Sequence, residues 1–387
     1  MDDFSVFQTV PKIVFGNGAI DSLGDEAKRL GATKTVVVTD PGLVKARVHE
    51  PAMAALEDAG LNPALYQDVE SDPKLEVVDS CLDFIRGHGA DLVVGLGGGS
   101  AMDISKAAAI MVKNEGPINK YAGVNLVPGP GLPTILVPTT AGTGSEVTSI
   151  AVLSDTKNRI KVGVVSDYMF ANTALLDPRL TLGLPPHVTA FTGLDALVHA
   201  IESYTGRMSS FITEVLALKA LKLIAGNLRL AYADGSNIDA RSNMLKASLL
   251  AGMAFGNTQT AGAHACALAL GEKYHIPHGI ATSLMLPSIM SFNSIAVPEK
   301  YAKIAEAFGE NINGLGRMDQ ADLAIKAIVR LIRDTGFTLG LENYKVSKEE
   351  IPEIAKGAMG AARLWKNNPR HCTEEQACNI FADAFES

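Results

Sequence analysis

The stretch Asp91-Leu92-Val93-Val94-Gly95-Leu96-Gly97-Gly98-Gly99-Ser100 is the most informative about the fold class. Its apolar half predicts a buried strand, and the Gly-rich turn leads into a helical pattern that starts near Ala101. Glycines let the backbone approach a phosphate, and a helix start supplies free N–H groups and a positive dipole end. We therefore predict a strand–turn–helix unit that binds a phosphate-bearing ligand. A turn that serves close packing alone is the alternative.

The turn departs from the regular spacing of dinucleotide-binding glycines. Ser100 stands where a third glycine is expected, and we predict it to be the N-cap of the following helix, with Asp103 as its capping-box partner. An acid normally follows such glycines by about 20 residues, but here the best candidate, Asp40, ends an apolar strand upstream. Its carboxylate could accept hydrogen bonds from ribose hydroxyls and repel a 2′-phosphate, or it could simply cap a helix.

The same alternation of strands and helices runs through the first half of the chain. Strands are expected at 12–16, 35–40, 65–69, 91–95, 133–138 and 174–176, with a hairpin over 151–165 and helices near 45–59 and 73–88. This order predicts a parallel sheet with helices on both faces, which gives an α/β Rossmann-like domain over residues 1–183.

The second half contains only helical patterns. Apolar residues recur at helical spacing in the segments 188–204, 210–230, 238–254, 258–271, 296–307, 318–335 and 348–363. We therefore predict an all-α domain over residues 184–387.

Composition excludes several classes of protein. The 387 residues are 47% hydrophobic and carry 34 basic against 42 acidic side chains, so bulk disorder and a nucleic-acid surface are disfavoured. No uncharged apolar run reaches the length of a membrane span, and the four cysteines form no CxxC motif. We expect a cytoplasmic protein that binds neither nucleic acid nor membrane.

A second loop adds to the predicted nucleotide site. Thr139-Thr140-Ala141-Gly142-Thr143-Gly144-Ser145 follows an expected strand and offers hydroxyls and flexible backbone. Two such loops at strand ends favour a dinucleotide over a mononucleotide.

The helical half contains four residues of ligand type in apolar surroundings. Asp195 and His199 are spaced i and i+4, so they lie on one helix face. His264 follows in another apolar helix, and His278 lies in a turn rich in helix breakers. One Asp and three His suit a divalent first-row metal ion, whereas histidines satisfied in a core are the alternative.

The chain resembles the iron-containing, or group III, alcohol dehydrogenase family nearly end to end. The motifs that carry the resemblance are Gly97-Gly98-Gly99-Ser100, Thr139 to Glu146, Thr192 to Glu202, Ala251-Gly252-Met253-Ala254-Phe255 and Pro277-His278-Gly279. The resemblance implies the dehydroquinate synthase-like fold and a metal-dependent, NAD(H)-linked alcohol dehydrogenase or aldehyde reductase. The substrate would be a small primary alcohol or aldehyde, and the enzyme a homodimer or larger homo-oligomer.

The resemblance also implies roles for individual residues. The metal ligands would be Asp195, His199, His264 and His278. The turn Gly97, Gly98, Gly99 and Ser100 would hold the pyrophosphate, and further cofactor contacts would come from Asp40, Thr139, Thr140, Thr143, Ser145 and Lys161. Phe255 matches the position that packs near the nicotinamide. Because the ligand set lacks thiolate, Fe²⁺ and Zn²⁺ both fit it, with Mn²⁺ or Co²⁺ possible by availability. The resemblance to the iron-containing family favours Fe²⁺. Asp40 predicts a preference for NAD(H) over NADP(H).

Two departures from the family pattern bear on the substrate. Leu268 stands where many members carry a second His near the nicotinamide, and His275 is a weak substitute. Arg363 and Trp365 lie where members more often have an acid followed by small residues, so both are candidates for substrate contacts, as is Phe255. A solvent-facing Arg363 on a terminal helix is the alternative. These departures raise the alternative of a small anionic aldehyde that carries a carboxylate, sulfonate or phosphonate. A lyase of the dehydroquinate synthase kind is a further alternative.

Overall fold

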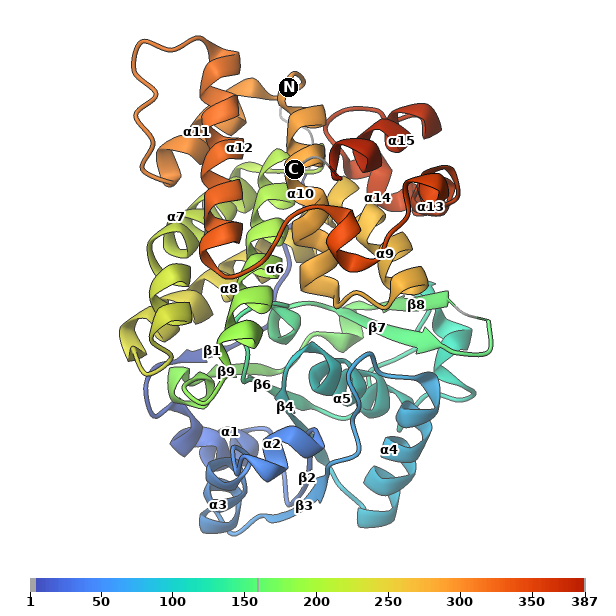
Figure 1. The fold of residues 1–387 in the computed structure, drawn as a ribbon. Coiled ribbons are helices and arrows are strands. Elements are labelled where there is room, and N and C mark those ends of the chain that lie inside the picture. Colours follow the sequence, from blue (N-terminus) through green and yellow to red (C-terminus); the bar gives the residue numbers. More distant parts are fainter. Residues whose placement is uncertain (1–4, 159, 386–387) are drawn as a thin grey trace. The chain divides into compact units, whose positions relative to one another are not determined.

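The computed structural model describes residues 5–158 and 160–385. They form two compact units, one of residues 8–183 and the other of residues 184–385 together with 5–7 (Figure 1). Each unit has its own secondary structure: strands and helices alternate in the first, and helices make up the second.

The first unit is built on a six-stranded parallel sheet. Its strand order is β1-β9-β6-β4-β2-β3. The strands are β1 (Ile13–Phe15), β2 (Lys34–Val38), β3 (Asn62–Tyr66), β4 (Leu92–Gly97), β6 (Thr134–Pro138) and β9 (Thr173–Leu176). Because both faces of a parallel sheet are covered, the central strands are largely apolar, and all six residues of β4 are buried.

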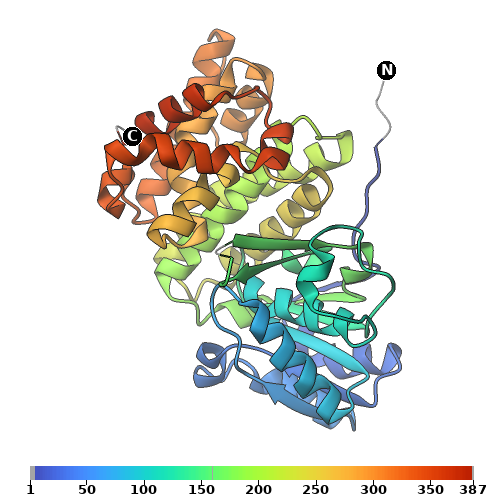
Figure 2. The same ribbon diagram turned by 90° about the vertical axis from the view of Figure 1, so that its right-hand side faces the viewer.

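Helices cover the two faces of this sheet (Figure 2). Alternate residues of a strand point to opposite faces, so Val37 packs in one core and Val36 and Val38 in the other. The first core includes residues of α1 (Leu23–Arg29) and α3 (Glu50–Asp58), and the second those of α4 (Leu75–His88) and α5 (Gly99–Met111). The short α2 (Pro41–Lys45) follows β2.

The order of the strands creates a reversal between β2 and β4. The chain passes from β2 outward to β3, and then returns to the other side of β2 to form β4. In open α/β sheets, ligands bind beyond the carboxyl ends of the strands at such a switch point. Asp40 follows β2 and Gly98 follows β4, so these two positions flank the reversal.

A smaller sheet accompanies the first. It consists of β5 (Gly123–Val124), β7 (Ile150–Asp155) and β8 (Ile160–Val165), and the predicted hairpin of β7 and β8 is present. The buried ammonium of Lys106 in α5 binds the hydroxyl of Ser145 at 2.7 Å and pairs with Asp103 at 3.1 Å. Asp103 also accepts hydrogen bonds from the Ser145 hydroxyl and the Val152 N–H.

This network corrects one prediction. The N-cap of α5 is Gly98 rather than Ser100, and Asp103 serves no capping box because its carboxylate is bound to the connection into β7. The first turn of α5 therefore has no side-chain cap among the described residues.

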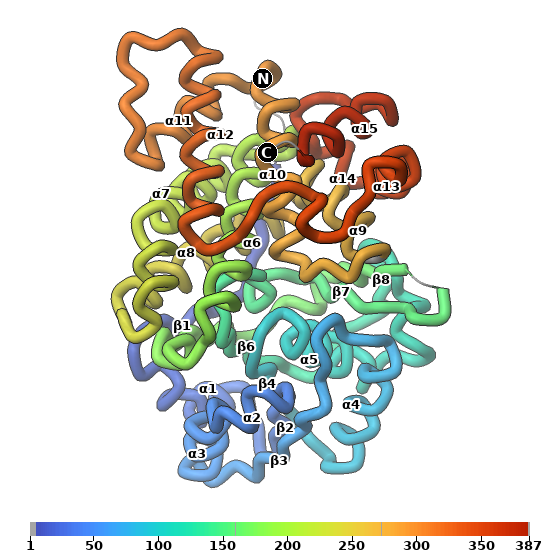
Figure 3. The backbone as a smooth tube through the Cα atoms, in the orientation of Figure 1, coloured from blue at the N-terminus to red at the C-terminus, as the bar shows by residue number. Residues whose placement is uncertain are grey.

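The second unit is a bundle of helices whose longest members lie side by side (Figure 3). These are α6 (Pro186–Thr205), α7 (Phe211–Ala233) and α8 (Ile238–Thr258). The remaining helices are α9 (Gly262–Tyr274), α10 (His278–Ser294), α11 (Pro298–Ala307), α12 (Arg317–Asp334), α13 (Ile351–Met359), α14 (Ala362–Asn367) and α15 (Glu374–Asp383). Among the described residues, none of the helices is long and apolar enough to cross a membrane.

Helix α10 is the main departure from the expected elements. The sequence predicts a turn around His278, whereas this residue is the first of a 17-residue helix that contains Pro287. The nearby glycine has a packing role: a Cβ at Gly279 would lie 2.3 Å from the carbonyl oxygen of Phe191 in α6. The glycine thus permits a helix–helix approach closer than any other residue would allow.

Candidate functional site

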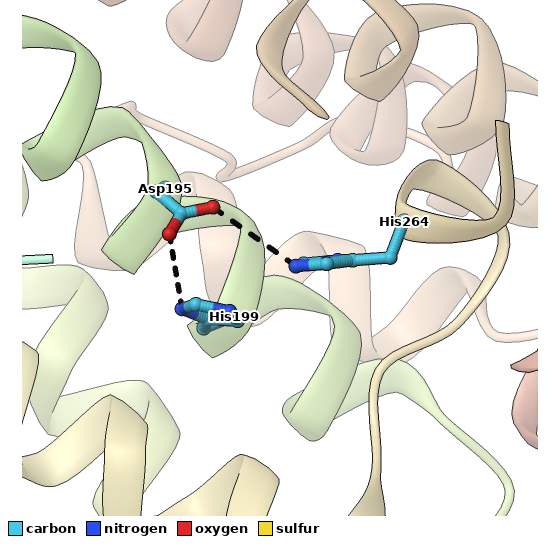
Figure 4. Close-up of side chains that lie close together, drawn as sticks. All are labelled: Asp195, His199 and His264. Atoms are coloured by element: carbon cyan, nitrogen blue, oxygen red, sulfur yellow. Dashed lines mark ion pairs between the residues drawn. The ribbon is translucent and has the colours of Figure 1, made fainter. Parts of the chain in front are cut away.

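The candidate metal centre begins with two side chains one turn apart on α6 (Figure 4). Asp195 and His199 are both buried, and the Asp195 carboxylate lies 3.9 Å from Nδ1 of His199. The helix forms because Ala, Leu and Val surround both polar residues, and most of its residues are buried.

Two more histidines reach the same carboxylate from other helices. Nε2 of His264 on α9 lies 4.0 Å from Oδ1 of Asp195, and Nε2 of His278 on α10 lies 3.9 Å from that oxygen. The approach of Gly279 to α6 brings His278 to this place. The structure therefore brings Asp195, His199 and His264 together as one buried group. The fourth predicted ligand, His278, faces the same carboxylate from a side chain that is 51% exposed.

These nitrogens are too far from the carboxylate for hydrogen bonds, and two of them have no other partner. Nδ1 of His199 and Nε2 of His264 are buried without a hydrogen-bond partner within the described chain. An unpaired buried nitrogen is costly, whereas ligands at about 2.0–2.2 Å from a shared ion lie roughly 3–4 Å from one another. The donor set and its spacing thus fit a divalent metal ion.

The protonation states favour the same interpretation. Burial lowers the pKa of His199 to about 4, although Asp195 opposes the shift. Burial alone would raise the pKa of Asp195, but the nearby His199, His278 and His264 lower it below its ordinary value. At neutral pH, Asp195 is ionised and His199 is neutral, which are the forms that bind metals. Burial alone would lower the pKa of His264, but Glu202 and Asp195 raise it above its ordinary value, so a metal ion must displace a proton there.

Phe255 on α8 borders the centre. Its ring stacks on His199 with the centroids 4.2 Å apart and the planes inclined by 17°. His199 also stacks on His264, with the centroids 4.8 Å apart. Packing thus fixes the orientation of the His199 ring.

Glu202 belongs to this centre, although the sequence alone assigns it no role. Its buried carboxylate accepts hydrogen bonds from the N–H groups of Ala261 and Ala263 and lies 2.7 Å from Nδ1 of His264. The available sequence signal is its position three residues after His199, on the helix that carries two predicted ligands.

The remaining substrate candidates occupy different environments. Trp365 on α14 is buried, and its indole N–H donates to the carbonyl of Ala358. A Cβ at Gly262 would lie 3.1 Å from the Trp365 ring, so this ring packs against the start of α9. Arg363 is exposed on α14, and the exposed His275 caps the end of α9.

The candidate nucleotide site lies in the first unit, where Asp40 and the Gly-rich turn are neighbours. Asp40 is the N-cap of α2 and accepts a hydrogen bond from the Leu43 N–H at 3.0 Å. Its other carboxylate oxygen would lie 3.7 Å from a Cβ at Gly97. The carboxylate therefore caps a helix and also borders the turn.

The second loop packs against the same turn. A Cβ at Gly99 would lie 2.9 Å from Thr143, and one at Gly98 would lie 3.6 Å from Thr140. The buried hydroxyl of Thr139 has no hydrogen-bond partner among the residues that the structure describes. Together with the uncapped start of α5, these features fit an anionic group held by backbone N–H groups.

Two predicted cofactor residues have structural partners. Ser145 belongs to the buried network with Lys106 and Asp103. Lys161 on β8 donates to the hydroxyl of Ser154 and pairs with Asp72.

Comparison with known proteins matches both parts of the chain to one family. Residues 11–178 match the family described as iron-containing alcohol dehydrogenase, and residues 189–385 match the C-terminal part of the Fe-containing alcohol dehydrogenase family. The chain is 48% identical to sulfoacetaldehyde reductase of Bilophila wadsworthia, over 99% of both chains.

Solved structures agree with the sequence comparison. A 1,3-propanediol oxidoreductase superimposes with a TM-score of 0.97 at 40% identity and covers 99% of this chain and all of its own. Sulfoacetaldehyde reductase from Bifidobacterium kashiwanohense, in complex with NAD⁺, superimposes with a TM-score of 0.91 at 32% identity over 99% of both chains.

Proposed function

We propose, because the chain belongs to the iron-containing alcohol dehydrogenase family, that it reduces a short aldehyde with NADH at a divalent metal ion. The proposed ligands are Asp195, His199, His264 and His278. The observation that carries the proposal is the pair of buried, unpartnered nitrogens on His199 and His264, both within 4.0 Å of the Asp195 carboxylate in the described chain. When bound, the ion supplies Lewis-acid polarisation of a substrate oxygen.

The protein's own residues perform the binding and the orientation. Asp195 contributes the negative charge that makes a buried cation tolerable. Phe255 holds the His199 ring in place by stacking. In the other unit, the uncapped start of α5 at Gly98 and Gly99 would hold the pyrophosphate through backbone N–H groups. The carboxylate of Asp40, which borders Gly97, would accept hydrogen bonds from the ribose.

We propose Fe²⁺ as the resident ion because the matched family is described as iron-containing. Zn²⁺ is the next candidate, because imidazole and carboxylate ligands also suit it. The cytoplasmic location and the homodimer stay predictions of the sequence.

Asp40 should set the preference for NADH. In Asp40→Asn the side chain can still cap α2 and bind a ribose hydroxyl, but it no longer repels a 2′-phosphate. We expect the ratio of kcat/KM for NADPH to that for NADH to rise about tenfold, which corresponds to about 1.4 kcal/mol. Steady-state kinetics with both cofactors measure this ratio, and a wild-type preference for NADPH would refute the role of Asp40.

The substrate we propose is a short aldehyde that carries a sulfonate. The first support is the 48% identity to a sulfoacetaldehyde reductase over 99% of both chains. The second is Arg363, an exposed cation on α14 that could bind a sulfonate. The test is a panel of sulfoacetaldehyde and uncharged aldehydes of similar size, each assayed by NADH oxidation. A higher kcat/KM for the uncharged members would overturn the sulfonate proposal and leave a neutral aldehyde as the substrate.

Arg363 is the cation that we expect to bind the sulfonate. Arg363→Ala should raise the KM for sulfoacetaldehyde about 10- to 100-fold, because a hydrogen bond between charged groups contributes about 1.5–3 kcal/mol. The KM for an uncharged aldehyde should not change. Lys366→Ala is the matched control, since Lys366 is an exposed cation on the same helix. Equal KM values for sulfoacetaldehyde in the two variants would exclude Arg363 from the site.

A further inference from the structure

Glu202 connects two helices of the candidate metal centre through a fully satisfied carboxylate. It lies on α6, three residues after His199, and is 3% exposed. One oxygen accepts from the Ala263 N–H at 2.6 Å, and the other accepts from the Ala261 N–H at 2.7 Å and lies 2.7 Å from His264 Nδ1.

The contact with His264 determines where that imidazole carries its proton. A neutral imidazole has one N–H donor and one acceptor nitrogen. A carboxylate that faces Nδ1 at 2.7 Å accepts a hydrogen bond, so the proton is on Nδ1. The lone pair is then on Nε2, the nitrogen that faces Asp195 at 4.0 Å.

We infer that Glu202 is a positioning residue that prepares His264 to bind the metal ion. It fixes both the tautomer and the ring orientation of His264, and it ties the start of α9 to α6 through two backbone N–H groups. Such a partner of a ligating histidine also raises the basicity of the ligand. The inference rests on the metal site of the proposed function.

Charge gives a second reason for a carboxylate at this position. Asp195 and Glu202 are both buried within the cluster, while Nδ1 of His199 lacks a partner within the described residues. Two negative charges balance one divalent cation, so the buried group as a whole becomes neutral when the ion binds. A buried charge without such compensation costs several kcal/mol.

A purely structural role for Glu202 is the competing explanation. The carboxylate accepts from the N–H groups of Ala261 and Ala263 where α9 begins, and this alone stabilises the helix start. A helix cap would affect the stability of the metal-free protein. It would not affect the affinity of the folded protein for metal.

The experiment compares Glu202→Gln with a matched control in the full-length protein. The glutamine side chain has the same size, but its NH₂ group cannot accept, and turned toward Nδ1 it would favour a proton on Nε2. Glu26→Gln is the control, because Glu26 is a buried glutamate of the other unit that binds Lys12, Arg29 and Thr173. The affinity for Zn²⁺ is measured by competition with a chromophoric chelator, and the melting temperature is measured without metal.

We expect the Kd for Zn²⁺ to rise about 10- to 100-fold in Glu202→Gln and to stay at the wild-type value in Glu26→Gln. Both variants should melt at lower temperature without metal. Wild-type affinity in Glu202→Gln would overturn the inference, whereas a wild-type protein that binds no Zn²⁺ would overturn the metal site itself.

Two further measurements apply if Glu202→Gln does not fold. Glu202→Asp keeps the charge but shortens the side chain, so its Kd should also rise. In the wild-type protein loaded with Zn²⁺, one imidazole N–H proton should resonate far downfield in the NMR spectrum and exchange slowly with solvent. An unchanged Kd in Glu202→Asp, or fast exchange of every imidazole N–H, would contradict the inference.

Discussion

Replacing Asp195 with alanine should abolish metal binding and lower kcat about 10³-fold or more. The three histidine nitrogens that face this carboxylate at 3.9–4.0 Å would then lose the one carboxylate that they share. A metal ion contributes several kcal/mol to the transition state, and each 1.36 kcal/mol corresponds to a factor of about ten in rate. His264→Ala should have the same effect.

Metal content by elemental analysis and single-turnover NADH oxidation measure these losses. The variants should retain a cooperative unfolding transition, because each substitution leaves the buried apolar residues of α6 and α9 in place. Asp177→Ala is the matched control: Asp177 is also a buried aspartate, but its carboxylate accepts from the N–H groups of Gly18 and Ile20 in the other unit. It should lose stability and keep its metal. A metal-loaded, active Asp195→Ala protein would refute the proposed ligand set.

Replacing Glu146 with glutamine should stabilise the protein at alkaline pH by about 3 kcal/mol. Glu146 is 1% exposed, and neither of its carboxylate oxygens accepts a hydrogen bond from another described side chain or backbone group. Burial raises its pKa from 4.5 to about 7, although the nearby Lys106 opposes the shift. The folded state therefore holds a proton that the unfolded chain releases near pH 4.5.

The sign of the pH dependence follows from this difference. The stability contributed by the protonated carboxyl is fully present below about pH 4.5 and is lost as the pH rises through about 7. A glutamine at this position stays neutral at every pH. The free energy of unfolding of the variant should therefore increase relative to that of the wild type as the pH rises from about 4.5 to about 7. This difference should stop growing once the wild-type carboxyl is fully ionised.

Chemical denaturation at a series of pH values tests this prediction. Glu26→Gln is again the control, because salt bridges and hydrogen bonds with Lys12 and Arg29 outweigh burial and lower the pKa of Glu26. This variant should lose stability at neutral pH rather than gain it. A pH-independent difference between Glu146→Gln and the wild type would show that the pKa of Glu146 is the same in the folded and unfolded protein.

The sequence predicts the architecture well where local periodicity and burial agree. The parallel sheet and the helical second half follow from apolar runs with β-branched residues and from apolar residues at helical spacing. The sequence does not predict helix α10, because Gly279 and Pro287 are residues that disfavour a helix. In the structure the glycine serves a close contact with α6 instead, and most of the helix is buried, so tertiary packing outweighs propensity.

The candidate site follows from the sequence only in part. The spacing of Asp195 and His199 indicates one helix face, but the meeting of His264 and His278 with them depends on helix packing. Glu202 receives no role from the sequence, because two of its partners are backbone N–H groups, which leave no side-chain signal.

The prediction of Ser100 as a helix cap is wrong for a similar reason. The spacing of Ser100 and Asp103 matches a capping box, but Asp103 pairs with the buried Lys106 and binds Ser145. The burial of Lys106 is not visible in a local pattern.

A metal titration of chelator-treated enzyme tests the proposed metal centre without any substitution. The metal-free protein is titrated with Fe²⁺ under anaerobic conditions, and the initial rate of NADH oxidation by sulfoacetaldehyde is recorded at each addition. We expect no activity without metal and a linear rise that ends at one bound ion per chain. Full activity in protein shown by elemental analysis to be free of metal would contradict a metal-dependent reaction.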